Sequence, residues 1–201
     1  YHEALNLFKD LLAEVFNRLL TECRAEIDAV KSQFPSEDCV INPVIITYPE
    51  GIALLRGAGV EIDDFDDINT EQEKLLGKLV KDKYNTDFYI MERFPATARP
   101  FYTMPDPEDP RYSNSFDMYL RGEEIVSGAQ RIHDTNLLLQ RAAELNVDLK
   151  PIQPYVDCFK YGAPPHAGLG CGLDRITFLF LGLNNVRRGS LFPRDPARLL
   201  P

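Results

Sequence analysis

Two acidic residues, Asp117 and Glu124, lie on neighbouring stretches of strand-like sequence that meet at Arg121-Gly122. Carboxylates that face each other on paired strands repel unless a cation or a substrate ammonium group lies between them. Carboxylate oxygens at this spacing suit a Mg²⁺ ion that keeps most of its waters and bridges phosphates. The plainer alternative is a solvated face of the sheet, which the spacing alone favours.

Arg131 follows a run of small residues, Ser127 to Ala129, near the end of the second strand. Small neighbours leave room for a ligand, and a planar guanidinium group can pair with a carboxylate or a phosphate. The alternative is a local ion pair with Asp134.

The spacing between Glu124 and Arg131 raises a problem of parity. They are seven residues apart, so a regular strand would point them to opposite faces of the sheet. A shared pocket therefore requires a β-bulge between them. We predict this bulge at Gly128.

Glycines alternate at positions 168, 170 and 172, and Arg175 follows them. Alternate glycines remove the side chains from one face of a strand, so another group can pack or bind directly on the backbone. Arg175 falls in the first turn of the next expected helix, where a cation opposes the helix dipole at a cost of about 0.3–1 kcal/mol. A bound phosphate would offset this cost. The spacing matches neither a dinucleotide-binding fingerprint nor a Walker loop.

Other polar residues give weaker signals. His166 could be an acid or a base, but with no evident Ser or Cys nucleophile a structural role is the more common one. The tail from 184 to 201 is basic and is interpreted either as a surface charge run or as an anion site.

The first half of the chain, residues 1–86, is predicted to be mainly helical. Apolar residues at three- and four-residue spacing predict one helix over 1–33, ended by Pro35. Residues 40–48 are expected to form a strand, 49–55 a short helix and 60–69 an acidic loop. A helix is expected over 70–84, with Thr70 and Glu73 as its capping box.

The second half, residues 87–201, is predicted to contain the sheet. Strands are expected at 88–91, 115–120, 123–132 and 167–172, with a proline-rich loop over 95–110. Helices are expected at 134–145, capped by Asp134, at 151–161, and at 173–183, the last nearly all apolar and buried on most sides. This order of elements favours an α+β architecture.

Composition limits the possible functions. The chain has 201 residues and a formal net charge of −9, which fits one large domain and argues against a general nucleic-acid coat. No Cys-x-x-Cys pair is present, so a structural zinc site is not expected, and the four cysteines are interpreted as free thiols of a reducing cytoplasm. No apolar run approaches the roughly 20 residues of a membrane span.

The stretch from Gly168 to Arg175, with the apolar sequence after it, resembles motif 3 of class II aminoacyl-tRNA synthetases. Further segments resemble the aspartyl-tRNA synthetases of the eukaryotic cytosolic and archaeal type. These are Pro100-Phe101-Tyr102-Thr103-Met104-Pro105, Arg121-Gly122-Glu123-Glu124-Ile125, Ser127-Gly128-Ala129-Gln130-Arg131-Ile132-His133-Asp134 and Ser190-Leu191-Phe192-Pro193-Arg194-Asp195. The resemblance covers essentially the whole chain, most densely from residue 84 onward.

This resemblance implies a class II synthetase catalytic domain, an antiparallel sheet flanked by helices that activates L-aspartate with ATP and transfers it to tRNA(Asp). It implies that Asp117 and Glu124 hold Mg²⁺ on the ATP phosphates, and that Arg175 contacts the nucleotide. The remaining residues carried over from the family are Gly170 and Gly172, which floor the adenosine pocket, Ser127 and Gly128, which floor the aspartate site, and Arg131, which takes the substrate's side-chain carboxylate.

The match departs from the family pattern in places. Leu169 and Asp174 stand where many eukaryotic members have Gly and Glu. Motif 3 is present, but motif 1, the Phe-Arg-x-Glu of motif 2 and the anticodon-binding barrel are absent from this sequence. Residues 1–201 therefore resemble the C-terminal portion of a catalytic domain whose parent is an active, cytoplasmic homodimer. The portion by itself is expected to be inactive and not to bind membranes.

Three alternatives stay open. The first is an asparaginyl-tRNA synthetase or an asparagine-forming paralogue, against which the run from Gln130 to Asp134 favours aspartate. The second is a non-catalytic, synthetase-like binding module. The third is a structural domain without a ligand.

Overall fold

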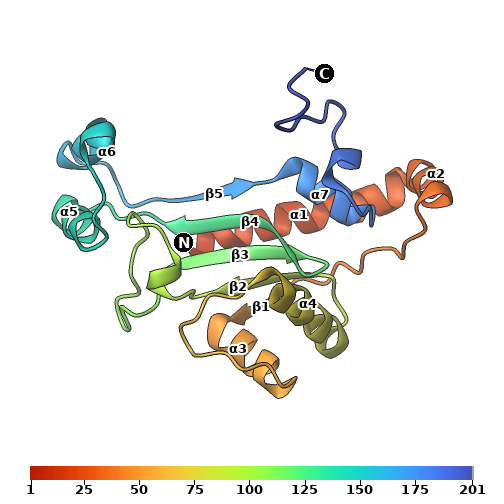
Figure 1. The fold of residues 1–201 in the computed structure, drawn as a ribbon, viewed down its shortest axis with the longest axis horizontal. Coiled ribbons are helices and arrows are strands. Elements are labelled where there is room, and N and C mark those ends of the chain that lie inside the picture. Colours follow the sequence, from red (N-terminus) through yellow and green to blue (C-terminus); the bar gives the residue numbers. More distant parts are fainter. Residues whose placement is uncertain (201) are drawn as a thin grey trace.

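The computed structural model describes residues 1–200 and contains a five-stranded sheet with helices on both faces (Figure 1). The strands follow the chain order across the sheet: β1 (Val44–Thr47), β2 (Phe88–Glu92), β3 (Ser115–Leu120), β4 (Glu123–Gln130) and β5 (Ala167–Cys171). The pairs from β2 to β5 are antiparallel, whereas β1 lies parallel to β2. The predicted α+β class is thus confirmed, and the expected antiparallel sheet has one parallel pair at its edge. That pair needs a long crossover, which the chain between β1 and β2 provides.

Seven helices surround this sheet in the described part of the chain. They are α1 (His2–Glu22), α2 (Arg24–Gln33), α3 (Tyr48–Gly57), α4 (Thr70–Tyr84), α5 (Thr135–Glu144), α6 (Gln153–Lys160) and α7 (Leu173–Phe180). Short 3₁₀ turns occur at Ala96–Ala98, Lys150–Ile152 and Val186–Gly189. Between residues 1 and 200, no helix has the length and apolarity needed to cross a membrane.

The prediction of one helix over residues 1–33 is wrong, because the helix breaks at Cys23. The backbone there has φ −112° and ψ 31°, which separates α1 from α2. A straight helix of this length would extend about 50 Å, well past the edge of a five-stranded sheet. The break lets Ile27 of α2 join the same buried cluster as Leu12 and Phe16 of α1.

The two faces of the sheet are covered differently. On one face, Phe116 and Val126 pack with α1 and α7 in a single buried cluster. On the other face, α3 and α4 cover β1, β2 and part of β3, where Tyr89 and Tyr119 stack with ring centroids 4.9 Å apart. The second face is left uncovered over β4 and β5, and the candidate site lies there.

A tight turn and a close helix contact fix the position of α4. Arg121 and Gly122 have φ values of 51° and 76°, which is typical of the two-residue hairpin turn that the sequence predicts. Gly77 of α4 lies on this turn so closely that an added Cβ would be 2.3 Å from the Gly122 Cα. Only a glycine pair allows the helix and the turn to approach in this way.

The bounds predicted for α4 are confirmed, but its predicted cap is not. Asn69, not Thr70, is the N-cap, and its side chain accepts hydrogen bonds from the amides of Glu71 and Gln72. Asn69 has an extended backbone while Thr70 is already helical, so the capping box pairs Asn69 with Gln72. Glu73 is consequently free for another role.

The elements that are shorter than predicted include the first strand and the last helix. The strand expected over 40–48 is limited to Val44–Thr47, and the helix expected over 173–183 ends at Phe180. That helix is buried on one side only, and Leu173 at its start is 74% exposed. The predicted cap of α5 is confirmed, since the Asp134 side chain accepts a hydrogen bond from the amide of Leu137.

Candidate active site

A β-bulge places Glu124 and Arg131 on the same face of the sheet. Met118 pairs with Val126 and Tyr119 pairs with Glu124, so Ile125 has no partner on β3. Ile125 and Val126 consequently both point into the core. The bulge that the parity argument requires is therefore present, but it lies at Ile125 and not at Gly128.

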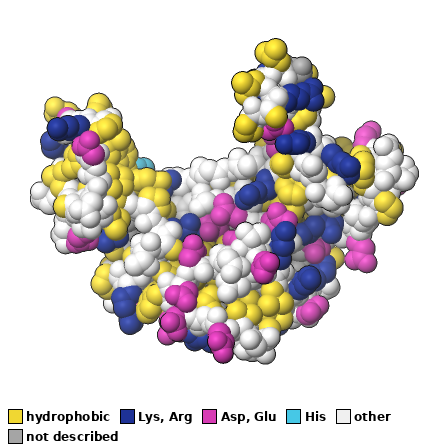
Figure 2. Space-filling model, viewed as in Figure 1, with side chains coloured by type: hydrophobic (Ala, Val, Ile, Leu, Met, Phe, Trp, Pro, Cys, Tyr) yellow, Lys and Arg dark blue, Asp and Glu magenta, His cyan; other side chains and the backbone are white. Residues whose placement is uncertain are grey.

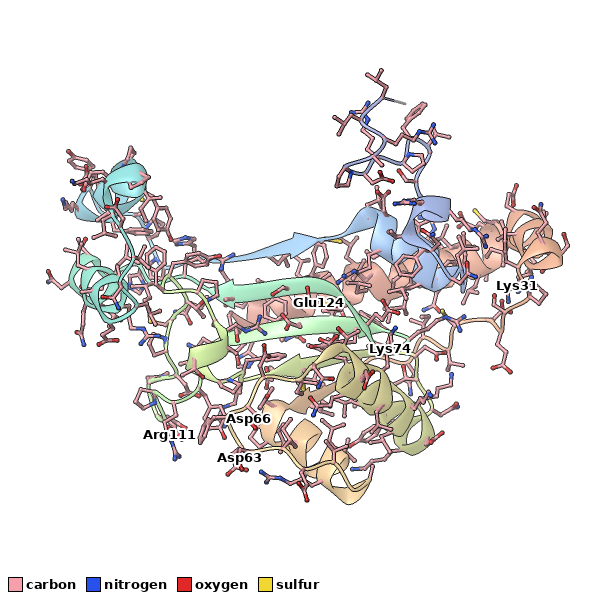
Figure 3. All side chains as sticks on the ribbon, in the orientation of Figure 1. Lys31, Asp63, Asp66, Lys74, Arg111 and Glu124 are labelled. Atoms are coloured by element: carbon pink, nitrogen blue, oxygen red, sulfur yellow. The ribbon has the colours of Figure 1, made fainter. Side chains whose placement is uncertain are left out.

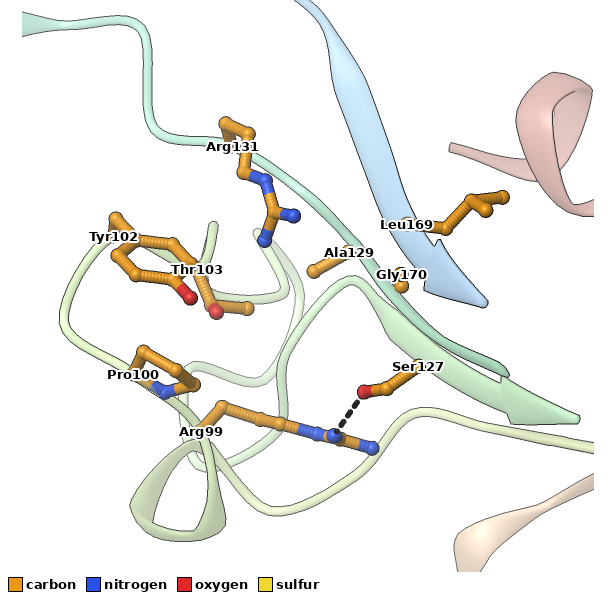
Figure 4. Close-up of a pocket in the computed structure, with 10 residues that line it drawn as sticks. Arg99, Pro100, Tyr102, Thr103, Ser127, Ala129, Arg131, Leu169 and Gly170 are labelled. Carbon is orange, nitrogen blue, oxygen red and sulfur yellow. Dashed lines mark hydrogen bonds between the residues drawn. The ribbon is translucent and has the colours of Figure 1, made fainter. Parts of the chain in front are cut away.

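The open face contains a cavity of about 380 Å³ next to Arg131 (Figure 4). One wall is the loop from Arg99 to Thr103, and the floor is formed by β4 and β5. The lining includes Arg99, Tyr102, Ser127, Gly128, Arg131 and Gly170. The volume is in the range typical of small-molecule sites.

The guanidinium group of Arg131 has no hydrogen bond or ion pair to any side chain or carbonyl within residues 1–200. It lies over the Tyr102 ring, with Cζ 4.9 Å from the ring centroid. The ion pair with Asp134 considered as an alternative is not formed, because the Asp134 carboxylate caps α5. A cation held against an aromatic ring beside an empty space can accept an anionic ligand.

The glycines of the site serve different purposes. A Cβ added at Gly170 would meet nothing within 4 Å, so this position keeps the cavity open. A Cβ added at Gly128 would lie 2.5 Å from the Phe116 ring, on the opposite face. Gly128 thus lines the cavity with backbone and is required for packing behind it. A Cβ at Gly172 would lie 3.3 Å from the Cβ of Arg175.

Asp117 and Glu124 both lie on the open face, and the charge of Asp117 acts on Glu124. Asp117 is 3% exposed and its Oδ2 pairs with Arg99 at 2.6 Å, while Oδ1 has no hydrogen-bond partner. Burial raises the pKa of Asp117, and the Arg99 charge opposes this rise. Burial, and next the charge of Asp117, raise the pKa of Glu124. Figure 3 shows Glu124 near the middle of this face.

A third acid, Glu73 of α4, joins this pair. Its pKa is raised to about 7, mainly by burial and then by the charges of Glu124 and Asp117, while Arg175 lowers it. Acidic side chains gather in the hollow of this face in Figure 2. Such a cluster has excess negative charge that a bound cation would neutralise.

The residues present fit a Mg²⁺ ion bound mostly by water and phosphate. No group of three or more His, Cys, Asp or Glu side chains in residues 1–200 forms a complete metal cage. Two carboxylates, one with an unsatisfied buried oxygen, are what Mg²⁺ requires from a protein when phosphates and waters supply the other ligands.

Arg175 connects the start of α7 to β4. Its Nη1 donates a hydrogen bond of 2.9 Å to the backbone oxygen of Glu124. The side chain is exposed, so the remaining guanidinium nitrogens face solvent. Arg131 and Arg175 therefore lie toward opposite ends of β4, with the acids between them.

Other polar residues singled out from the sequence lie elsewhere. His166 is outside the cavity, and its ring stacks on Phe159 with centroids 5.9 Å apart. In the tail, Arg187 pairs with Asp195 at 2.6 Å, and Arg188 lies over the Phe34 ring.

Sequence reasoning missed two residues of this site, Arg99 and Glu73. Arg99 lies in the proline-rich loop, 18 residues from its partner Asp117, and no local pattern connects them. Glu73 was assigned to a helix cap. The repulsion expected between Asp117 and Glu124 was the one sequence signal that could have indicated Arg99, because two neighbouring carboxylates require a cation nearby.

The raised pKa of Glu73 predicts a pH-dependent loss of stability. The ordinary value is 4.5 and the folded value is about 7. The stabilising contribution of the protonated form is therefore complete below pH 4.5 and is lost as the pH rises through about 7. Glu73→Gln is expected to match the original chain at pH 5 and to be the more stable at pH 8. Urea unfolding at both values measures this.

Glu71, exposed on the same helix, provides the matched control. Glu71→Gln is not expected to stabilise the chain at pH 8 as Glu73→Gln does, because the Glu71 side chain is exposed. A difference between Glu73→Gln and the original chain that did not change with pH would contradict the burial of the Glu73 carboxylate among like charges.

Comparison with known proteins identifies the family. A family model described as tRNA synthetases class II (D, K and N) matches residues 1–196. The chain belongs to this class II tRNA synthetase family. The fold expected from the resemblance is thereby confirmed.

Three class II synthetases illustrate the relationship. The chain is 56% identical over 203 residues to the cytoplasmic aspartate–tRNA ligase of Caenorhabditis elegans, with 100% of this chain and 38% of that protein covered. An aspartyl tRNA synthetase structure from Entamoeba histolytica has a TM-score of 0.96 and 48% identity, covering 100% of this chain and 42% of that one. An asparaginyl-tRNA synthetase from Pyrococcus horikoshii complexed with asparaginyl-adenylate has a TM-score of 0.83 and 30% identity, covering 98% and 45%. This synthetase chain thus spans about two fifths of each.

Proposed function

We propose that residues 1–201 are the C-terminal portion of the catalytic domain of a cytoplasmic aspartate–tRNA ligase. The parent enzyme would activate L-aspartate with ATP and transfer it to tRNA(Asp), acting as a homodimer. The observation that carries this proposal is the unpaired guanidinium group of Arg131 at the cavity. High identity to an aspartate–tRNA ligase supports it.

The aspartate subsite is assigned to the cavity. Arg131 would pair with the side-chain carboxylate of the substrate, and its fork geometry allows two parallel hydrogen bonds. Ser127 and the backbone of Gly128 form the floor beside it. Asparagine lacks the charge, so the pairing discriminates against it.

The nucleotide subsite is assigned to the part of the open face that adjoins the cavity toward the start of β4. Gly170, which also lines the cavity, and Gly172 would floor the adenosine pocket, and the exposed nitrogens of Arg175 would meet the nucleotide phosphates. Glu124 and Asp117 would hold Mg²⁺, which when bound neutralises phosphate charge. A solved relative that carries asparaginyl-adenylate supports adenylate chemistry in this family.

Catalysis in this arrangement requires no protein nucleophile. The α-carboxylate of aspartate attacks the α-phosphorus of ATP and pyrophosphate leaves. A ribose hydroxyl of the 3′-terminal adenosine of tRNA then attacks the carbonyl carbon of the mixed anhydride, the aminoacyl ester forms, and AMP leaves. Arg131 fixes the amino acid and Arg175 fixes the nucleotide, so positioning and charge neutralisation supply the rate increase. The sequence lacks a Phe-Arg-x-Glu motif, and we expect the 201-residue chain alone to be inactive.

The main alternative is an asparagine-specific enzyme of the same fold. The structural similarity to an asparaginyl-tRNA synthetase supports this alternative. The unpaired Arg131 favours an anionic substrate over a neutral one. Pyrophosphate exchange by the complete enzyme, with aspartate or asparagine as the amino acid, tests this. We expect exchange with aspartate and little with asparagine. The reverse preference would overturn the assignment, and no exchange with either would indicate a non-catalytic module.

A further inference from the structure

Arg99 is the most constrained cation beside the cavity. Its side chain is 11% exposed and its Nη2 lies 2.6 Å from Asp117 Oδ2. Its Nη1 donates a hydrogen bond of 3.2 Å to Ser127 Oγ (Figure 4). The guanidinium group also lies 3.9 Å from the centroid of the buried Phe94 ring. Partners on three sides hold this group in one orientation.

These contacts place Arg99 between two parts of the site. Toward one side it lines the cavity together with Arg131. Toward the other it covers Asp117, which lies directly across from Ser127 in the β3–β4 pairing. Arg99 thus separates a buried carboxylate from the space assigned to an anionic substrate.

The charges at this wall depend on Arg99. Arg99 and Arg131 carry two positive charges and Asp117 carries one negative charge, so these three side chains together have a net charge of +1. Without Arg99 the net charge would be zero, and an unpaired carboxylate would lie next to the cavity. An anionic ligand would then be repelled at short range in a partly buried site, where charges are poorly screened. A neutral ligand would be affected little.

We propose that Arg99 is a positioning residue that determines specificity: by neutralising Asp117 and holding the Ser127 hydroxyl, it keeps the cavity selective for a dicarboxylic amino acid. This inference rests on the proposed function. It assigns the choice of substrate charge to two arginines, of which Arg131 binds the substrate and Arg99 neutralises a competing carboxylate.

The experiment is equilibrium binding of L-aspartate and L-asparagine to the complete enzyme. Arg99→Gln is expected to weaken aspartate binding about tenfold or more and asparagine binding less than about threefold. Adding Asp117→Asn to this variant is expected to restore most of the aspartate affinity, because the unpaired negative charge is gone. Arg99→Lys keeps the charge and is expected to keep most of the preference for aspartate.

Arg111 provides a matched control from the same loop. It also forms an ion pair of 2.6 Å, with Asp109, and also lies near an aromatic ring, that of Phe65 at 5.1 Å. It is 68% exposed and does not line the cavity. Arg111→Gln is expected to leave both affinities unchanged.

The outcomes separate the possible failures. If the unmodified enzyme does not prefer aspartate, the proposed function fails. The inference is overturned if the unmodified enzyme prefers aspartate but Arg99→Gln weakens the binding of both amino acids equally. It is also overturned if adding Asp117→Asn does not restore aspartate affinity, because Arg99 would then have only a structural role. Should Arg99→Gln fail to fold, Asp117→Asn alone decides. Asp117→Asn makes the net charge beside the cavity more positive, so it is expected to strengthen the preference for aspartate over asparagine. A weakened preference would refute the inference.

Discussion

Replacing Arg131 with glutamine is expected to lower aspartate-dependent pyrophosphate exchange by the complete enzyme about 1,000-fold. The substrate carboxylate would lose a charged, two-pronged partner and would be buried without compensation. Folding should be preserved, because the guanidinium group has no polar partner within residues 1–200 to lose. Exchange kinetics and a thermal melt of the same preparation measure both effects.

Two further variants sharpen this test. Arg131→Lys keeps the charge but loses the fork, so intermediate activity is expected. Arg18→Gln removes an exposed arginine of α1, whose partner is Glu22, and should have no effect. If Arg131→Gln kept a rate of aspartate-dependent pyrophosphate exchange within about tenfold of the unmodified enzyme, the assignment of the carboxylate subsite would be contradicted.

The second large effect is expected from Gly77→Ala, which should lower the free energy of unfolding by about 1–2 kcal/mol. An added Cβ would lie 2.3 Å from the Gly122 Cα and 2.8 Å from its nitrogen, and backbone atoms cannot move aside cheaply. Overpacking of this kind costs about 1–3 kcal/mol, and here the obstacle is backbone. The gain of about 1 kcal/mol from replacing a helical glycine offsets only part of the cost. Urea unfolding of the chain measures the net result.

Gly57→Ala is the matched control. Gly57 is also a helical glycine, in α3, but a Cβ added there would meet nothing within 4 Å. This substitution is expected to be neutral or to stabilise by up to about 1 kcal/mol. If both variants gave the same change, the close contact between α4 and the hairpin turn would not be energetically significant.

Elements with strong local signals were predictable from the sequence. The hairpin turn at Arg121-Gly122 and the α5 cap at Asp134 depend on neighbouring residues alone, and both are confirmed. The site residues on one strand were equally accessible, because parity places Ser127 and Arg131 on one face. Their roles toward substrates remain predictions.

Features that depend on distant partners were not predictable. The helix break at Cys23 brings Ile27 into the core cluster of α1, a tertiary contact that no local pattern indicates. The bulge was assigned to Gly128 because glycine is the most permissive residue, yet the Phe116 ring behind it already fixes that position. Arg99 was missed because its partner is brought to it by the fold.

The bulge at Ile125 carries a consequence for insertions and deletions. Removing this one residue would give β3 and β4 an uninterrupted ladder of pairs, and by the usual criteria a more regular hairpin. It would leave Glu124 on the face of Arg131, because the two residues would then be six apart in a regular strand. Only the Ile125 side chain would be lost from the core on the side of α1 and α7. A one-residue deletion elsewhere between Glu124 and Arg131 would keep the bulge and turn one of these two side chains away from the cavity. The position of a length change in this strand therefore decides whether both side chains still face the same space.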